Sequence, residues 1–103
     1  MPKTVKVAQT DELLPGSGKV VDADGRSIAL FNVEGTFYAI ENTCTHRGGP
    51  LGEGALIGES VTCPRHGAKF NVKTGAVTGP PAGTGVRSFV VKVEGQYVLV
   101  EVD

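Results

Sequence analysis

The sequence predicts an all-β protein, and three observations lead to this prediction. The apolar residues fall in short, β-branched segments between turn residues, which is typical of strands. No stretch keeps a helical period over a long run. Fifteen glycines and six prolines among 103 residues favour turns over long helices.

The first elements are predicted to be a strand over residues 4–8 and one helical turn over residues 10–14. Strands over residues 19–22 and 27–33 then flank a hairpin turn at Asp24-Gly25. A second turn, over residues 33–36, leads into a strand over residues 37–41.

The last elements repeat this arrangement, with strands over residues 88–93 and 96–102 around a turn at Glu94-Gly95. The segments VEGTFYAI and VEGQYVLV, at residues 33–40 and 93–100, resemble each other. We interpret the likeness as two hairpins that share turn chemistry, not as an internal duplication.

Residues 42–85 differ from these framework segments. They contain ten of the fifteen glycines and every cysteine and histidine, with brief strands expected only over residues 60–63 and 69–72. A chain of 103 residues is long enough for one domain. We therefore expect a single domain, residues 1–103, with a loop-rich insert over about residues 42–85 where functional loops are presented by a sheet framework.

Composition excludes several classes of protein. A net charge of −1 provides no strong field to bind nucleic acid or an anionic membrane surface. Two cysteines are too few for an all-cysteine iron–sulfur cluster or a multi-disulfide scaffold. No apolar run is long enough for a membrane span or a secretory signal, so a cytoplasmic protein with reduced thiols is expected.

Four metal-ligating side chains stand in two short, glycine-bearing segments. Cys44-Thr45-His46 is followed, after sixteen residues, by Cys63-Pro64-Arg65-His66, which gives the pattern C-x-H…C-x-x-H. These spacings let two side chains of one turn converge on one centre, and nearby glycines let backbone N–H groups approach it.

Three interpretations compete for these residues. A disulfide between Cys44 and Cys63 leaves the histidines unexplained and fits a cytosolic chain poorly. A structural zinc site has the right ligand set, but zinc fingers usually group cysteines together and histidines together. The third interpretation is a two-iron, two-sulfide cluster with two cysteines on one iron and two histidines on the other. Each segment carries one cysteine and one histidine, so each would send one ligand to each iron.

The segments CTHRGGPL and CPRHGAKFNVKTGAV resemble the paired cluster-binding loops of Rieske proteins, and residues 79–82 resemble that family's third, proline-bearing loop. The further residues that stand at family positions are Gly48, Leu51, Pro64, Gly67, Phe70, Thr74 and Gly75. The resemblance spans the chain and implies the small Rieske fold, an antiparallel β-sandwich with a loop-rich cluster-binding subdomain.

The resemblance also implies one [2Fe-2S] cluster and its ligands. Cys44 and Cys63 would bind the inner iron, and His46 and His66 the outer iron near the surface. The two histidines would then form the electron exit to the partner.

Four residues indicate which kind of Rieske protein this is. Gly49 and Arg65 stand where high-potential members carry two bridging cysteines. Ala68 and Phe70 stand where those members place a Ser and a Tyr that donate hydrogen bonds to sulfur. Fewer donors leave the sulfur charge less stabilised, so we expect a potential toward the negative end of the Rieske range, which runs from about −150 to +300 mV.

The cluster would use both histidines, which leaves none for the mononuclear iron of an oxygenase. The chain therefore resembles a stand-alone Rieske-type ferredoxin, an electron carrier and not an enzyme. The resemblance implies a protein that takes one electron from a ferredoxin reductase and delivers it to a terminal oxygenase, often one that hydroxylates aromatic rings. A monomer is expected by default. The small Rieske subunit of an assimilatory nitrite reductase is the alternative.

A docking surface for the partner is expected around the cluster. Residues 43–79 carry a net charge of +2, with Arg47, Arg65, Lys69 and Lys73 against Glu53 and Glu59. We expect these charges to form a basic rim around an apolar tip. The tip residues are Leu51, Pro80 and Pro81. Such a surface suits a transient, salt-sensitive partner.

Overall fold

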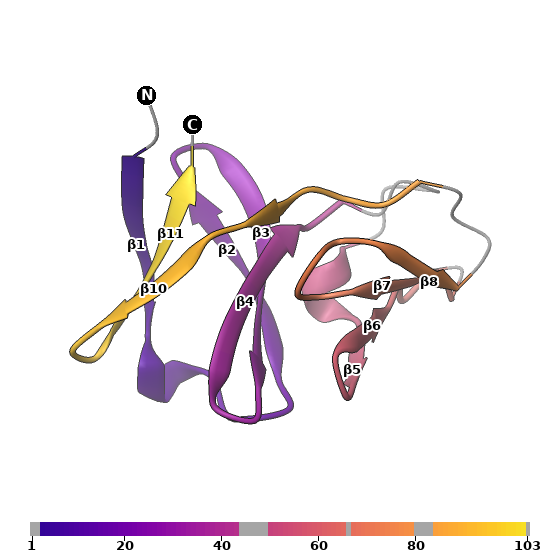
Figure 1. Ribbon diagram of the computed structural model, residues 1–103, viewed down its shortest axis with the longest axis horizontal. Coiled ribbons are helices and arrows are strands. Elements are labelled where there is room, and N and C mark those ends of the chain that lie inside the picture. The colour runs from indigo at the N-terminus through magenta and orange to yellow at the C-terminus, as the bar shows by residue number, and fades with distance from the viewer. Residues whose placement is uncertain (1–2, 44–49, 66, 80–83, 103) are drawn as a thin grey trace.

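Three antiparallel sheets make up the computed structural model, which describes residues 3–43, 50–65, 67–79 and 84–102 (Figure 1). Over these ranges the helical residues are confined to two short 3-10 turns, so the all-β prediction is confirmed. No helix within these ranges is long and apolar enough to cross a membrane.

Two of the sheets form what we call the base. The first has the order β1 (Lys3–Gln9), β11 (Tyr97–Val102), β10 (Val91–Glu94). The second has the order β2 (Gly18–Ala23), β3 (Arg26–Val33), β4 (Thr36–Glu41), β9 (Ser88–Phe89). Alternating apolar residues of both sheets pack against one another, as expected for a sandwich.

The third sheet belongs to the segment between β4 and β9, and we call it the insert sheet. It follows the 3-10 turn η2 (Leu51–Glu53) and runs as a meander of β5 (Ala55–Ile57), β6 (Ser60–Thr62), β7 (Lys69–Asn71) and β8 (Val77–Gly79). The sequence predicted β6 and β7 but missed β5 and β8. β5 lies between Gly54 and Gly58, and β8 ends on Gly79, so glycines interrupt the apolar pattern at both missed strands.

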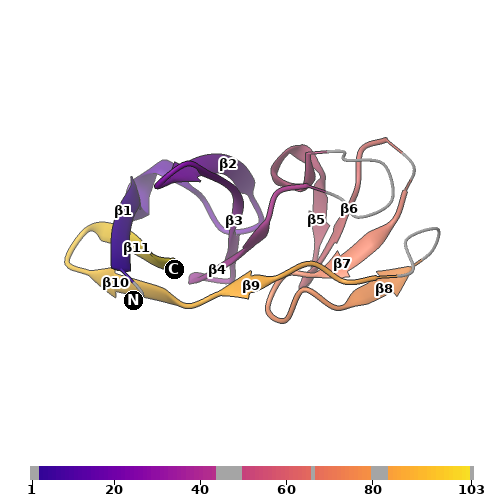
Figure 2. The same ribbon diagram turned by 90° about the horizontal axis from the view of Figure 1, so that it is seen from above.

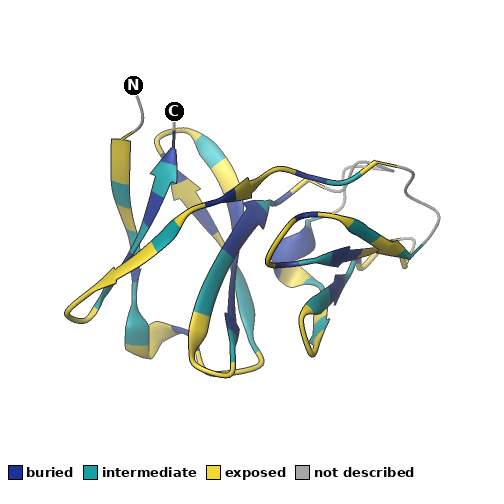
Figure 3. Ribbon diagram, in the orientation of Figure 1, coloured by how far each residue is buried: buried dark blue, intermediate teal, exposed yellow. Residues whose placement is uncertain are grey.

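Strand β3 is buried on both faces and joins the two halves of the molecule (Figure 3). Ile28 and Leu30 pack into the core of the base, whereas Ala29 and Phe31 pack into a second core shared with the insert. Strands alternate their side chains between faces, so one apolar run supplies both cores.

The predicted helical turn is present over a shorter range, as the 3-10 turn η1 (Thr10–Glu12). The chain after η1 is fixed by Asn32, a buried side chain of β3. The Asn32 Nδ2 donates to the carbonyl of Leu13 at 2.8 Å, and its Oδ1 accepts from the backbone N–H of Gly35 at 2.8 Å. The Asn32 amide thereby provides hydrogen-bond partners for a carbonyl in the loop after η1 and for an N–H in the turn after β3.

Both predicted N-terminal hairpin turns are confirmed. Asp24-Gly25 and Glu34-Gly35 occupy left-handed backbone conformations, with φ of 56° and 86° in the first turn and 52° and 94° in the second. Positive φ at both central residues defines the type I′ turn, whose twist matches that of the flanking strands.

The C-terminal hairpin turn was predicted one residue too early. Glu94 pairs with Tyr97, so the turn consists of Gly95 and Gln96. Gly95 alone of the two has a positive φ, of 61°, which is the signature of a type II′ turn with glycine first. The tripeptide Val-Glu-Gly therefore opens two different kinds of turn in this chain.

The predicted strand over residues 88–93 is also divided. β9 pairs with β4, whereas β10 pairs with β11 in the other sheet of the base. Val90 lies between them, and its carbonyl accepts a hydrogen bond from the N–H of Glu101 at 2.9 Å. The chain bends here because it passes from one sheet to the other (Figure 2).

Replacement of Glu34 with Asn is expected to stabilise the protein. A side chain with a Cβ costs about 1–2 kcal/mol in the left-handed region, and Asn tolerates this region far better than Glu. We expect a gain of about 1 kcal/mol in the free energy of unfolding, or about 4–8 °C in Tm, measured by thermal unfolding. The control is Glu94→Asn, at a strand position with ordinary φ, where no gain is expected.

Candidate metal centre

Cys63 directly follows β6 and closes the connection to β7. Its N–H donates to the carbonyl of Ala68 at 2.7 Å, and its carbonyl accepts from the N–H of Gly67 at 3.1 Å. The strands pair up to Thr62 and Lys69. The segment with the second predicted ligand pair is therefore a hairpin connection whose start is fixed by main-chain hydrogen bonds.

The side chain of Cys63 is 1% exposed and forms no disulfide. It belongs to the core shared by the base and the insert, together with Phe31, Val61, Ala68 and Phe70. A buried Cys without a disulfide can be an ordinary apolar core residue, and as a metal ligand its thiolate charge would be compensated by the metal. The surroundings of Cys63 leave its sulfur available as such a ligand.

The first predicted ligand pair, Cys44 and His46, lies in the chain between residues 42–43 and residues 50–52. We call such flanking segments stems, and the structure brings these two together. Thr43 and Pro50 form an isolated antiparallel bridge. Beside it, the side chain of Asn42 accepts a hydrogen bond from Gly52 N–H at 2.8 Å and donates one to Ser27 Oγ at 3.1 Å. Asn42 is 8% exposed, and its bond to Gly52 is buried, whereas its bond to Ser27 on β3 is only partly buried.

Three of the four predicted ligands, Cys44, His46 and His66, lie outside the described residues. Of the predicted ligands the structure therefore places Cys63, together with the residues that flank the other segments along the chain. In the part of the chain that the structure describes, no three His, Cys, Asp or Glu residues gather closely enough to hold a metal ion. The donor set that the sequence predicts consists of two thiols and two imidazoles, which are the ligands of a Rieske centre and also of a zinc site.

The third segment, residues 79–82, resembles a proline-bearing loop in its sequence. Its two stems contact the insert and the end of β4. Its first stem is the end of β8, and its second stem is residues 84–87. In the second stem, Val86 N–H donates to the carbonyl of Gly75 at 2.8 Å. Val86 is buried in the same core as Cys63, so the stem borders the candidate centre.

The predicted apolar tip needs a correction. Leu51 is fully buried because η2 packs it into the core below the insert sheet, so it is not a surface residue. Pro80 and Pro81 lie outside the described residues. Of the predicted rim, Arg65, Lys69 and Glu53 are exposed, and Arg47 lies outside the described residues.

Lys73 and Glu59 form an ion pair on the insert instead of contributing free charges to a rim. The Lys73 Nζ lies 3.1 Å from Glu59 Oε2 and 5.4 Å from the centroid of the Tyr38 ring on β4. The pair thus links the insert to the base. Hydrogen bonds from Lys73 and Asn71 hold the pKa of Glu59 below its ordinary value, and the bond to Glu59 raises the pKa of Lys73.

Asn71 is a structural residue that the sequence analysis missed. Its Oδ1 accepts hydrogen bonds from the N–H groups of Lys73 at 2.8 Å and Thr74 at 3.2 Å, and its carbonyl accepts one from Gly75 N–H at 2.8 Å. These bonds shape the turn that presents Gly75 to the third segment. An Asn at the end of a short strand, before a Thr-Gly turn, is the signal that points to such a role.

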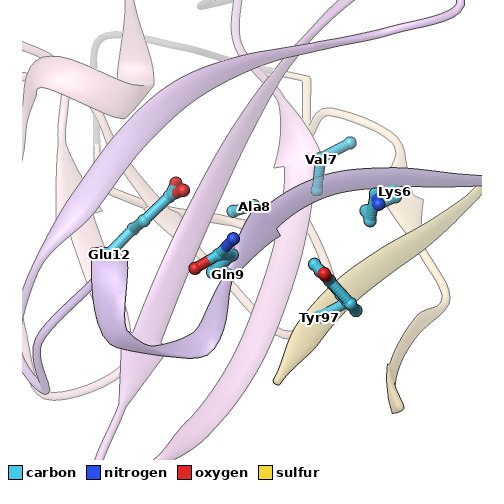
Figure 4. A pocket seen from close by; sticks show the side chains of 6 residues that line it. All are labelled: Lys6, Val7, Ala8, Gln9, Glu12 and Tyr97. Carbon is cyan, nitrogen blue, oxygen red and sulfur yellow. The ribbon is translucent and has the colours of Figure 1, made fainter. Parts of the chain in front are cut away.

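A hollow of about 290 Å³ lies elsewhere (Figure 4), between elements at the end of the molecule away from the insert sheet. β1, η1 and β11 border it, and Lys6 Nζ lies 4.1 Å from the centroid of the Tyr97 ring there. The hollow is open and distant from Cys63, so it is separate from the candidate centre.

The fold and the site together define a small β protein in which a base of two sheets carries an insert that contains the predicted ligand segments. The Rieske [2Fe-2S] domain model matches residues 3–90, so the chain belongs to this family. Membership implies an iron–sulfur cluster. The resemblance seen in the sequence is thereby confirmed.

Similar proteins indicate the kind of Rieske protein. The biphenyl dioxygenase ferredoxin subunit of Pseudomonas sp. (strain KKS102) is 38% identical over 97 residues, which are 93% of this chain and 89% of that protein. The solved ferredoxin of carbazole 1,9a-dioxygenase from Nocardioides aromaticivorans IC177 is 36% identical, with a TM-score of 0.91 over 95% of this chain and 96% of that chain.

A further solved structure is a complex of reduced oxygenase and oxidised ferredoxin in carbazole 1,9a-dioxygenase. Its matching chain is 37% identical, with a TM-score of 0.89 over 94% of this chain and 91% of that chain. These relatives are named as ferredoxins or ferredoxin subunits. The expectation of an electron carrier and not a catalytic subunit is therefore confirmed.

The ion pair on the insert predicts a pH dependence. Because the pKa of Glu59 is lowered in the folded state, its contribution to stability is present above the unfolded value of 4.5 and is lost as the pH falls through the folded value. An NMR titration of the Glu59 carboxyl is expected to show the lowered pKa. Lys73→Met should move it back toward 4.5, whereas Lys92→Met, on β10, should leave it unchanged.

Proposed function

We propose that the chain is a cytoplasmic, monomeric one-electron carrier that holds one Rieske [2Fe-2S] cluster. It takes electrons from a ferredoxin reductase and delivers them to a terminal oxygenase. The observation that supports this most directly is the buried sulfur of Cys63, at the start of the C-x-x-H motif in a chain of the Rieske family. The whole chain, residues 1–103, acts as one domain.

The proposed ligands are Cys44 and Cys63 for one iron and His46 and His66 for the other. When bound, the cluster accepts and returns one electron. Cys63 contributes a thiolate from the core side, where water is excluded and backbone groups are already paired. The main-chain bonds around Cys63 keep its position fixed, so little rearrangement is needed when the charge at the site changes.

The partners are proposed from the relatives. The solved complex of an oxygenase with a ferredoxin supports a terminal oxygenase as the acceptor. A ferredoxin reductase is proposed as the donor, because a one-electron carrier must be reduced again after each delivery. The nitrite reductase subunit remains the alternative, and a reconstitution with both sets of partners separates the two.

The experiment that tests the cofactor is a pair of absorption and EPR spectra, of the oxidised and the reduced protein. A Rieske signal with an average g below that of all-cysteine clusters is expected. This signal should be abolished or altered by each of four substitutions, Cys44→Ser, Cys63→Ser, His46→Ala and His66→Ala. Ser60→Ala, on the strand β6 that leads to Cys63, should retain the signal. A colourless protein that contains zinc would contradict the proposal.

The proposed low potential rests on two buried residues without hydroxyl groups. Ala68 and Phe70 are both fully buried in the core that contains Cys63. They stand where high-potential Rieske proteins place hydroxyl donors. Neither side chain can therefore stabilise the additional negative charge of the reduced state by a hydrogen bond to sulfur.

Ala68→Ser is expected to raise the reduction potential. A hydrogen bond that stabilises the reduced state by about 1 kcal/mol corresponds to about 40 mV for one electron. The measurement is a spectroscopic redox titration of the purified protein. Ala29→Ser is the matched control, because Ala29 is equally buried in the same core but lies on β3. Equal shifts in the two variants would attribute the effect to core polarity and not to a donor at position 68.

A further inference from the structure

Glu41, the last residue of β4, binds the backbone of Arg87 in two ways. The N–H of Glu41 donates to the carbonyl of Arg87 at 2.9 Å, and the N–H of Arg87 donates to the Glu41 Oε1 at 2.9 Å. The pairing of β4 with β9 includes Ile40 and Ser88. The carboxylate therefore satisfies the Arg87 N–H next to this pair, in a bond that joins residues 46 positions apart.

The other side of the same segment rests on the insert. Val86 N–H donates to the carbonyl of Gly75, and a Cβ added to Gly85 would lie 2.5 Å from that carbonyl oxygen. Val86 is buried in the core that contains Cys63. Residues 85–87 are therefore held between the insert on one side and the end of β4 on the other (Figure 2).

The neighbour of Glu41 performs the equivalent task for a different segment. Asn42 binds the N–H of Gly52, and its carbonyl accepts a hydrogen bond from the N–H of Leu51 at 2.7 Å. Two consecutive residues at the end of β4 thus hold two stems that are distant in sequence. One stem follows the first predicted ligand pair, and the other follows the third segment.

We propose that Glu41 is a positioning residue that couples these two stems. Its carboxylate fixes the backbone at Arg87 relative to β4, three residues before Cys44. The essential property is the acceptor oxygen and not the negative charge, so a neutral acceptor of the same shape should replace it. The inference rests on the proposed function in one respect. The stems matter because they flank the segment proposed to hold the cluster and the third, proline-bearing segment.

The first test is amide hydrogen exchange of the purified protein, followed by NMR. Glu41→Ala should accelerate exchange of the Arg87 N–H by about fivefold to tenfold, since the hydrogen bond to the side-chain oxygen is lost. Glu41→Gln, whose amide oxygen still accepts, should stay within about twofold of the unchanged protein. Glu94→Ala, at the exposed end of β10, is the control and should have no effect on Arg87.

The second test compares the EPR spectrum and the reduction potential of the loaded variants. Removal of the charge is common to Glu41→Gln and Glu41→Ala, so any difference between them reports on the lost hydrogen bond. We expect Glu41→Ala to change both readouts beyond the change in Glu41→Gln. Gly85→Ala disturbs the same stem from the insert side, because its Cβ would meet the Gly75 carbonyl, and should change the spectrum in a similar way.

Two results would overturn the inference. One is unchanged exchange of the Arg87 N–H in Glu41→Ala. The other is faster exchange there together with identical spectra and potentials in Glu41→Ala and Glu41→Gln, which would mean that the stem does not affect the site. The exchange readout does not require a cofactor, so it also separates this inference from the proposed function, which fails if the unaltered protein shows no Rieske signal.

Discussion

The burial of β3 on both faces is the constraint on which the rest of the structure depends. Its odd and even residues enter different cores, so Phe31 packs toward the insert while Leu30 packs toward the base. A strand with two apolar faces has no stable place at a surface, and the insert must therefore cover it. Cys63 lies in the core that this covering creates, which ties the position of a proposed ligand to the packing of the scaffold.

Features that depend on local chemistry were predictable from the sequence. The Asp24-Gly25 turn follows from the preference of type I′ turns for Asp-Gly, and at Glu34-Gly35 the glycine between two β-branched segments marks the turn. The turn at Gly95 was misplaced because the same tripeptide fits two turn types, and cross-strand pairing decides between them. Leu51 was expected at the surface, since sequence alone does not show that a short 3-10 turn folds back onto β3.

The residues of the candidate site were likewise predictable only where their chemistry is local. The C-x-x-H motif identified Cys63 because ligand spacing is a local property. Glu41 and Asn42 were not identified as supports, because their partners lie 46 and 10 or 15 residues away and an acid or amide at a strand end has no distinctive pattern. Side chains that cap distant backbone groups become visible only after the fold brings those groups together.

The pairing of β1 with β11 has a practical consequence for studying electron transfer. Lys3 lies opposite Val102, so the two end strands run side by side in the base, on the side of the molecule away from the insert (Figure 1). A linker or an affinity tag placed at either end would leave the insert exposed. Fusions to a redox partner can therefore be designed without covering the candidate site.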